Sequence, residues 1–440
     1  MNPIRQLPLV VAISAALTCS VHAQSLVDLY ASARTYDATF QSAKSQFDAT
    51  LARAEQSRAL VLPTANLGII GSRVNEQHDP TSLPGYERTF SNDSISITAS
   101  QPLYRPANWA GYQQGQRQLD LAQVQLTLAN QDLIVRVSQA YFDVLAAQDG
   151  LTFIKTQKAA VAEQLASAKR NFEVGTATIT DTREAQARYD LVMAQEIAAE
   201  NELRVKTLAL DQLVGKSNTR PTPLAQPLAL PALVPNDVTA WVQQGQAASP
   251  GIMQAQIALD VAQLETQKAQ AGHKPTLDLT AQLINSNNLR GFGLGEEVQQ
   301  AAIGVNFNLP LFAGFATQNR IKETLALQEK AASDLEGTRR NVEQATRAAY
   351  LGIVSGLGQV NALEAAEVSS QSAVDANKLG YQVGVRINID VLNAQSQLYD
   401  TKAKLAKARY DVLVAGLKLR QANGTLTADD LNAINALLVK

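Results

Sequence analysis

The feature that most constrains this chain is an internal duplication, in which the second half repeats the first at an offset of about 209 residues. The segment Phe172-Glu-Val-Gly175 recurs as Tyr381-Gln-Val-Gly384. Further matches extend in both directions, among them Tyr141 with Tyr350, Gln186 with Gln395, and Gly215 with Gly424. A long repeat of this kind predicts one supersecondary plan built twice. We therefore expect two structural repeats, residues 24–215 and 237–424.

A proline-rich segment, residues 216–236, separates the two repeats. Its prolines are Pro221, Pro223, Pro227, Pro231 and Pro235. Proline lacks a backbone N–H and breaks helices, so this segment is neither a long helix nor a central strand. We expect a linker here, and a short C-terminal tail over residues 425–440.

The first 23 residues have the pattern of a secretory signal peptide. Arg5 supplies a positive charge, residues 7–17 are mostly apolar, and Val21-His22-Ala23 is a small-residue cleavage site. The single cysteine, Cys19, lies inside this segment, so the mature chain is expected to have no disulfide. Beyond the signal, no run of about 18 apolar residues occurs. If the mature chain crosses a membrane, it must do so with strands.

Each repeat contains the same predicted series of helices and strands. A helix of about 35 residues precedes two short strand-like runs, and a helix of about 65 residues follows and ends at a Val-Gly turn. A last helix of about 35 residues ends at a glycine that suits a helix terminus. The predicted ranges are 25–60, 107–171 and a helix ending at Gly215, then 237–272, 315–380 and a helix ending at Gly424. A 65-residue helix is about 100 Å long, the length of two 35-residue helices end to end.

The strand-like runs alternate apolar and polar residues over about ten positions, as in a tilted outer-membrane strand. The apolar positions are Leu67 and Ile69; Ile95, Ile97, Ala99 and Leu103; Leu277, Leu279, Ala281 and Leu283; and Ile303, Val305, Phe307 and Leu309. A half-buried sheet in a soluble domain explains one such run better, but four runs behind a signal peptide favour the membrane. Four strands cannot close a barrel. Because open edges in lipid leave backbone groups unpaired, other copies of the chain must complete it.

The last helix has a coiled-coil seam with a side of small residues. Apolar residues recur every seven positions, and small residues follow three later. The two series are Val391, Leu398, Leu405, Val412 and Leu419, and Ala394, Thr401, Ala408, Ala415 and Ala422. The matching seam of the first repeat is poorer, because Glu196 and Lys206 interrupt it. Helices that pack this closely can enclose a tube.

Catalysis, cofactors and nucleic acid are all disfavoured by the composition. The chain has a net charge of −2 and no basic block, so nucleic acid is not an expected partner. In the mature chain the histidines are His78, expected in a strand-connecting loop, and His273, expected just before a strand. Neither has a companion at metal-ligand spacing. We expect no enzyme, no metal and no cofactor.

Two aspartates at the Val-Gly turns have two possible roles. Asp181 and Asp390 each open a predicted helix, and Asp181 has Glu184 three residues on, as in a capping box. The simpler reading is a helix N-cap worth about 1 kcal/mol. If copies of the chain surround a pore, the carboxylates instead form an acidic ring that favours cations. Tyr381 and Arg386 flank the second turn and could hold it against the first, through Asp181 or Thr180.

The whole mature chain resembles the TolC family of outer-membrane channel proteins, most closely over Gly380-Tyr-Gln-Val-Gly-Val-Arg386, Asp390-Val-Leu-Asn393 and Gly424-Thr-Leu-Thr-Ala-Asp429. The resemblance implies a homotrimer in outer-membrane lipid, with a 12-stranded β-barrel (four strands per chain) continued by a periplasmic α-helical coiled-coil barrel. It implies an equatorial belt containing the linker and tail. It also implies docking to a periplasmic adaptor (membrane fusion) protein and to an inner-membrane ABC or resistance-nodulation-division pump.

The same resemblance assigns roles at the periplasmic entrance. Tyr381 matches the family's linking tyrosine, with Asp181 as its partner, and Arg386 matches the linking arginine, with Thr180 among its partners. Asp390 matches one of two aspartate rings. The second ring's position is Asn393, a departure that leaves one ring and puts strong cation binding in doubt.

These observations together predict a passive export duct in the outer membrane that extends into the periplasm. Its entrance would be closed at rest and opened by partner proteins. Drug efflux and type I protein secretion both remain open as its task. The rival from another class is a periplasmic coiled-coil scaffold or adaptor without a channel, and a soluble enzyme is a more distant third.

Overall fold

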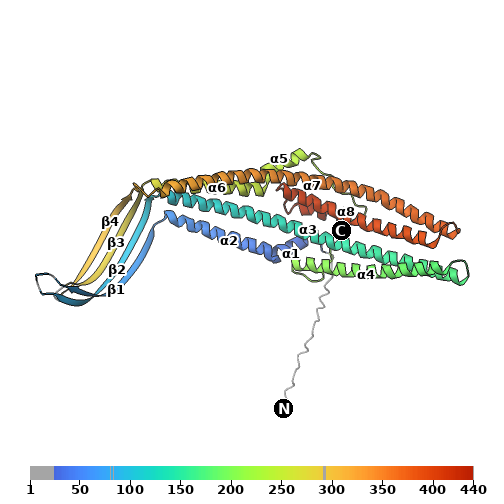
Figure 1. Ribbon diagram of the computed structural model, residues 1–440, viewed down its shortest axis with the longest axis horizontal. Helices are drawn as coiled ribbons and strands as arrows, with labels where there is room; N and C mark the ends of the chain where they lie inside the picture. The colour runs from blue at the N-terminus through green and yellow to red at the C-terminus, as the bar shows by residue number, and fades with distance from the viewer. Residues whose placement is uncertain (1–23, 80, 83, 291–293, 440) are drawn as a thin grey trace, which may run out of the picture.

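The computed structural model describes residues 24–79, 81, 82, 84–290 and 294–439, so the predicted signal peptide, residues 1–23, lies outside the described part. Figure 1 shows an elongated molecule with a curved sheet at one end and long helices running to the other. The same element order occurs twice along the chain. The first series is α1 (Leu26–Tyr36), α2 (Ala38–Arg58), η1 (Ala59–Val61), β1 (Thr64–His78), β2 (Tyr86–Tyr104), α3 (Pro106–Glu173) and α4 (Ile179–Val214). The second is α5 (Val238–Ala248), α6 (Pro250–Gln270), η2 (Ala271–His273), β3 (Thr276–Arg290), β4 (Leu294–Asn308), α7 (Ala316–Gln382) and α8 (Asn388–Ala422), after which α9 (Asp430–Asn435) lies in the tail.

The first helix of each repeat is broken, so the prediction of single helices over 25–60 and 237–272 was wrong. Asp37 ends α1 and caps α2, where its carboxylate accepts a hydrogen bond from the N–H of Phe40 at 2.8 Å. In the second repeat α6 begins at Pro250, which has no N–H to continue α5. Both breaks therefore follow from local backbone hydrogen bonding rather than from the apolar periodicity.

The long helices agree with the prediction. The α3 helix has 68 residues and α7 has 67, which corresponds to about 100 Å each. Gly215 lies directly beyond α4 with φ of 69°, and Gly424 lies two residues beyond the end of α8 with φ of 80°. This left-handed conformation is costly for residues with a Cβ, which is why glycine ends these helices.

The four strands form one antiparallel sheet in the order β1-β2-β3-β4. They have 15, 19, 15 and 15 residues, longer than the expected ten. The register is continuous except for a bulge at Leu103, which places Tyr104 opposite Leu277. His78 is the last residue of β1. The prediction that it lies in the connecting loop was wrong.

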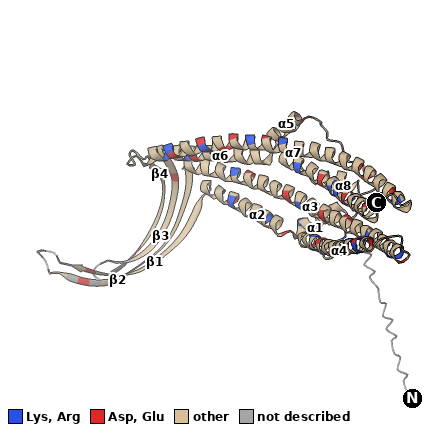
Figure 2. Cartoon of the chain, turned by 45° about the vertical axis from the view of Figure 1, so that its right-hand side comes forward, with Lys and Arg blue, Asp and Glu red and all other residues tan. Residues whose placement is uncertain are grey.

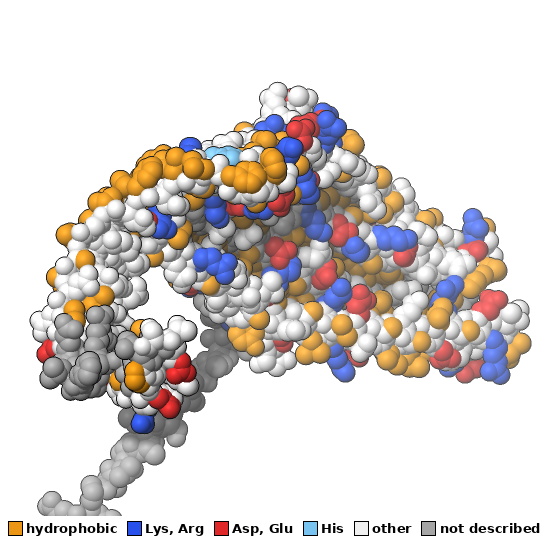
Figure 3. Space-filling model, turned by 60° about the vertical axis from the view of Figure 1, so that its left-hand side comes forward, with side chains coloured by type: hydrophobic (Ala, Val, Ile, Leu, Met, Phe, Trp, Pro, Cys, Tyr) orange, Lys and Arg blue, Asp and Glu red, His pale blue; other side chains and the backbone are white. Residues whose placement is uncertain are grey.

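The predicted alternation separates two faces of the sheet near the helices. The apolar side chains form rows across neighbouring strands, because Leu67 lies opposite Ile97, which lies opposite Leu283. We call this face the convex belt, and Figure 3 shows its side chains along the outer curve of the sheet. Its residues are Leu67, Ile69, Ile95, Ile97, Leu277, Leu279, Leu283, Ile303, Val305 and Phe307.

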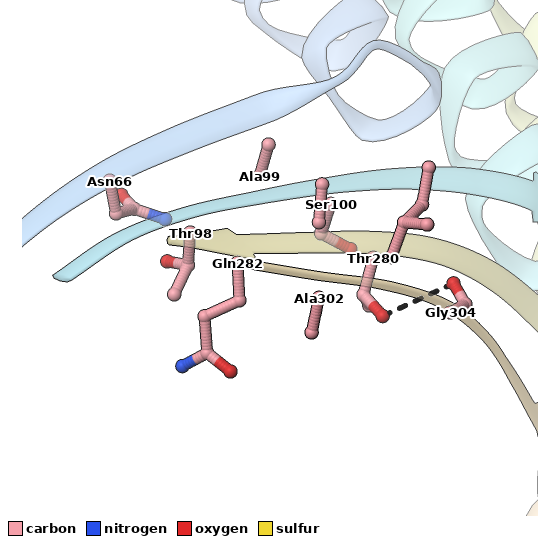
Figure 4. A pocket seen from close by; sticks show the side chains of 10 residues that line it. Asn66, Thr98, Ala99, Ser100, Thr280, Gln282, Ala302 and Gly304 are labelled. Carbon is pink, nitrogen blue, oxygen red and sulfur yellow. Dashed lines mark hydrogen bonds between the residues drawn. The ribbon is translucent and has the colours of Figure 1, made fainter. Parts of the chain in front are cut away.

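The opposite, concave face is polar next to the helices. Asn66, Thr98 and Gln282 lie in one row across β1, β2 and β3, and Ser100 and Thr280 lie in the next. Together they line a shallow hollow of about 410 Å³, shown in Figure 4. Figure 2 shows that charged residues are spread along the helices, while the middle of the strands carries few.

The main apolar core lies where the helices of both repeats meet the tail, halfway along the helical part. Tyr141 and Phe142 of α3 are buried there, and Phe142 stacks on Tyr410 of α8 at 5.5 Å between ring centroids. The hydroxyl of Tyr410 donates to Asp149 at 2.6 Å, and burial raises the pKa of that carboxyl. The hydroxyl of Tyr141 donates to the carbonyl of Thr222 at 2.7 Å and so ties the linker to this core.

The two helix pairs pack differently, as expected from their seams. In the α7/α8 pair all five predicted seam residues from Val391 to Leu419 are buried. In the α3/α4 pair the intruding residues make ion pairs across the seam, with Lys206 bound to Asp143 at 2.9 Å and Glu196 bound to Lys158. Within the described residues, no helix is both long enough and apolar enough to cross a membrane.

Candidate functional site

The two Val-Gly turns lie together at the end of the helices far from the sheet (Figure 1). Gly175 joins α3 to α4 with φ of 79°, and Gly384 joins α7 to α8 with φ of 77°. Only glycine adopts this backbone conformation without strain, so the two turns conserve the same shape in both repeats. This end of the molecule contains all five predicted site residues, Thr180, Asp181, Tyr381, Arg386 and Asp390.

Asp181 does not cap its helix in the way that was predicted. The N-cap of α4 is Thr178, whose hydroxyl accepts a hydrogen bond from the N–H of Asp181 at 3.2 Å. The Asp181 carboxylate accepts in return from the Thr178 N–H at 2.9 Å, which makes a capping box three residues earlier than expected. In α8 the residue at the N-cap position is Ile387, so Asp390 lies in the first turn and is not the cap either. Both carboxylates lie in the first turn of their helices, where their negative charge interacts favourably with the positive end of the helix dipole.

Arg386 lies over the second turn, where Gly380 has no side chain and leaves space for it. The N–H groups of Val385 and Arg386 both donate to the carbonyl of Gly380, at 2.8 and 3.0 Å. A Cβ added to Gly380 would lie 2.7 Å from Cγ of Arg386, so the arginine stem occupies the space that glycine leaves. The Arg386 side chain is 59 % exposed, and its guanidinium lies 3.7 Å from the carboxylate of Asp390. A cation and an anion thus sit next to each other at the tip.

Tyr381 joins the two helix pairs, but through a residue that was not predicted. The side-chain amide of Asn171, near the end of α3, donates to the Tyr381 hydroxyl at 3.1 Å. Within the chain, Tyr381 therefore contacts α3 rather than Asp181, and Arg386 contacts Asp390 rather than Thr180.

Two further polar contacts connect α8 to the first pair. Arg188 of α4 donates to the side-chain oxygen of Asn393 at 2.7 Å, and Gln164 of α3 donates to that of Asn388. Asn393 is the position at which the resemblance described above implies an aspartate. Here its neutral amide takes a partner from the other helix pair.

One apolar side chain lies at the centre of these contacts. Leu392 of α8 is 0 % exposed and packs into a cluster formed by α3 and α4. The cluster consists of Val161, Leu165, Ala168, Ala185 and Val192. Leu392 thus leaves its own pair and inserts into the other, with Asn388 one turn before it and Asn393 beside it. The arrangement can hold the two pairs together and can release them if the pairs rotate.

The sequence did not predict the contacts of Asn171, Arg188 and Leu392 between the two helix pairs. Arg188 follows Asp181 by seven residues, two helical turns along the same face, so its position offered a usable signal. Leu392 carried no such signal, because it falls one residue after the seam position Val391. No group of acidic, histidine or cysteine side chains within the described residues is arranged to hold a metal ion.

A comparison with protein families and curated proteins bears directly on this arrangement. The model of the outer membrane efflux protein family matches residues 29–216 and 241–425. The chain is 34 % identical over 423 residues to the outer membrane protein TolC of Vibrio cholerae, covering 96 % of this chain and 95 % of that protein. It is 30 % identical over 422 residues to the alkaline protease secretion protein AprF of Pseudomonas aeruginosa, covering 95 % and 88 %.

Solved structures with the same fold include two outer-membrane proteins. The outer membrane protein VceC of Vibrio cholerae has a TM-score of 0.76 at 17 % identity, covering 91 % of this chain and 96 % of that one. The CmeC outer membrane channel of Campylobacter jejuni has a TM-score of 0.77 at 17 % identity, covering 93 % and 88 %. At these identities the likeness shows the fold alone. The match of the family model over both repeats and the 34 % identity over nearly the whole chain establish that the chain belongs to the outer membrane efflux protein family.

Proposed function

We propose that copies of this chain assemble into an export duct that crosses the outer membrane and extends into the periplasm. One observation carries the proposal: the sheet has an apolar convex face, a polar concave face and two unpaired edges, β1 and β4. An apolar outside and a polar inside are what a barrel wall needs in lipid. The helices would continue the wall below the membrane.

The open edges require further copies. Each unpaired backbone group in lipid costs several kcal/mol, so the β4 edge of one copy must pair with the β1 edge of the next. Three copies would supply twelve strands, enough to close a barrel with an open lumen. A homotrimer is the assembly that we propose, in keeping with the family.

We assign the gate to the helix tips, at Thr180, Asp181, Tyr381 and Arg386. The exposed guanidinium of Arg386 is free to reach Thr180 or Asp181 of a neighbouring copy once the tips gather around an axis. Under the same symmetry, Asp390 of each copy contributes to an acidic ring at the entrance. Its proximity to Arg386 weakens the field of that ring, because the two charges partly cancel.

The turns themselves offer a docking surface for a periplasmic adaptor. Val174, Val383 and Val385 are 72 %, 65 % and 79 % exposed at the tips. Apolar side chains exposed together mark protein contact sites. An inner-membrane pump, of the ABC or resistance-nodulation-division class, would supply the energy through that adaptor.

The names of two relatives indicate which classes of cargo are possible. One relative is a protease secretion protein of Dickeya chrysanthemi, PrtF, and another is the outer membrane efflux protein BepC of Brucella suis. Both small molecules and proteins therefore remain candidate cargoes. A periplasmic scaffold without a channel does not require a long amphipathic sheet, so this alternative is not supported.

The gate is tested by single-channel recording of the purified mature protein in planar bilayers. The double variant Tyr381→Phe, Arg386→Ser removes one hydroxyl and one charge without adding bulk. We expect a small resting conductance in the parent and at least a several-fold larger one in the variant. An unchanged conductance would refute the gate assignment, and the absence of any pore in the parent would refute the duct.

A further inference from the structure

The strands run well beyond the convex belt. From Ile70 to His78, β1 continues for about 30 Å at the usual rise of a strand. The register with β2 shows no shift over this distance, so even-numbered residues remain on the concave face and odd-numbered residues on the convex face. The exposure of side chains supports this over residues 71–77 of β1 and 90–98 of β2, where the even positions are half-buried and the odd positions are exposed. Ile70, at the start of this part of β1, is 62 % exposed.

Beyond the belt, the convex face becomes polar and hydrogen-bonded. The amide of Asn75 donates to the carboxylate of Glu87 at 3.0 Å on the first hairpin. The amide of Asn285 donates to the carboxylate of Glu297 at 3.1 Å on the second. Such a surface suits water rather than lipid, which places this part of the sheet outside the membrane.

Beyond the belt, the concave face includes apolar side chains. Val74 lies directly opposite Phe90, and both side chains are half-buried on the concave face. Ile70 and Val298 occupy the two ends of one row across the sheet, joined through serines on β2 and β3. Ile284 lies in the adjoining row and begins the apolar zone. The concave face beyond the belt thus has two rows that contain apolar side chains, one with Ile70 and Val298 and one with Val74 and Phe90, separated by the polar pair of Ser72 and Asn92.

We propose that Ile70, Val74, Phe90 and Val298 form an apolar collar that narrows the outer mouth of the duct and contacts the cargo as it leaves. The inference rests on the proposed function, because the concave face becomes a lumen only when the barrel closes. With three copies, the row of Val74 and Phe90 places six apolar side chains at one level. An apolar constriction resists water and ions more than a polar one of equal width does. The collar is therefore a second determinant of passage, at the end opposite to the helix tips.

The alternative is that Val74 and Phe90 only stabilise their hairpin as a cross-strand pair. The two explanations differ in what they predict for passage through the lumen. A stabilising pair affects assembly or heat resistance but leaves the width of the mouth unchanged. A collar changes the largest solute that enters from outside.

The experiment uses the full mature protein carrying Tyr381→Phe and Arg386→Ser, so that the helix tips do not limit the current. Polyethylene glycols of increasing size are added on the external side, and the largest polymer that reduces the current is recorded. We expect Phe90→Ala to raise this size limit and to raise conductance about 1.5-fold, as an apolar constriction is relieved. Phe90→Trp, which keeps an aromatic ring in the pair, should lower both.

The matched control is Thr89→Ala, the neighbouring residue on the convex face of the same strand. It should change neither the size limit nor the conductance. The collar is refuted if Phe90→Ala and Phe90→Trp leave the size limit unchanged, or if Thr89→Ala shifts it equally. Absence of any pore in the parent would instead refute the duct, and the collar with it.

Discussion

Leu392 is the side chain whose loss should most directly loosen the contact between the helix pairs. It is fully buried against α3 and α4, and truncation to alanine removes contacts on both of those helices. Replacing a fully buried leucine by alanine costs about 3–5 kcal/mol in comparable cores. If roughly half of this loss falls on the contact between pairs, the closed state loses about 2 kcal/mol, roughly a 30-fold shift toward opening.

The assay is open probability in planar bilayers at fixed voltage. The matched control is Leu405→Ala on the same helix, where the leucine is 2 % exposed but packs within its own pair against Val360. Leu392→Ala should raise open probability strongly, while Leu405→Ala should lower thermal stability with little effect on opening. Equal effects of the two variants would contradict a specific role for Leu392, as would an unchanged open probability in Leu392→Ala.

Two further predictions concern stability. Arg105 binds the buried carboxylate of Asp278 with two hydrogen bonds of 2.6 Å where the sheet meets the helices. Arg105→Gln leaves this carboxylate unpaired and should cost about 2–3 kcal/mol, less than a fully buried pair because the arginine is 42 % exposed. Heat dissociation of the oligomer measures this, with the exposed-pair variant Arg117→Gln as a control expected to cost under about 1 kcal/mol. Burial raises the pKa of Asp149 above its usual 3.8, so the folded chain binds more protons there than the unfolded chain, and stability should rise as pH falls from neutrality through the raised pKa toward 3.8. Asp149→Asn should flatten this part of the pH profile of apparent Tm, and a profile identical to the parent's would contradict it.

Much of the architecture could be predicted because it depends on repeated local patterns. Small residues beside a heptad of apolar ones fix the α7/α8 pair, and strict alternation fixes the two faces of the sheet. The helix breaks were missed because they depend on single hydrogen bonds, such as the one that Asp37 makes to the first turn of α2. The strands were predicted too short because their apolar face ends with the belt, while the backbone pairing continues.

The candidate gate residues lie at the helix tips, with contacts within the chain that differ from the expected ones. The family resemblance located Tyr381 and Arg386 at the right end of the molecule. Their partners within the chain, Asn171 and Asp390, depend on how the two pairs are rotated against each other. That rotation is set by the insertion of Leu392 between helices distant in sequence, which no local pattern reveals.

The central claim is that the sheet is the wall of a membrane-spanning duct, with its convex face to lipid and its concave face to water. Cysteine scanning tests this directly, because the single cysteine, Cys19, falls within the predicted signal peptide. Single cysteines are placed at successive positions 95 to 98 of β2 and treated, in intact outer membranes, with a water-soluble thiol reagent. We predict modification at Ser96 and Thr98 and protection at Ile95 and Ile97. Equal labelling at all four positions would contradict it.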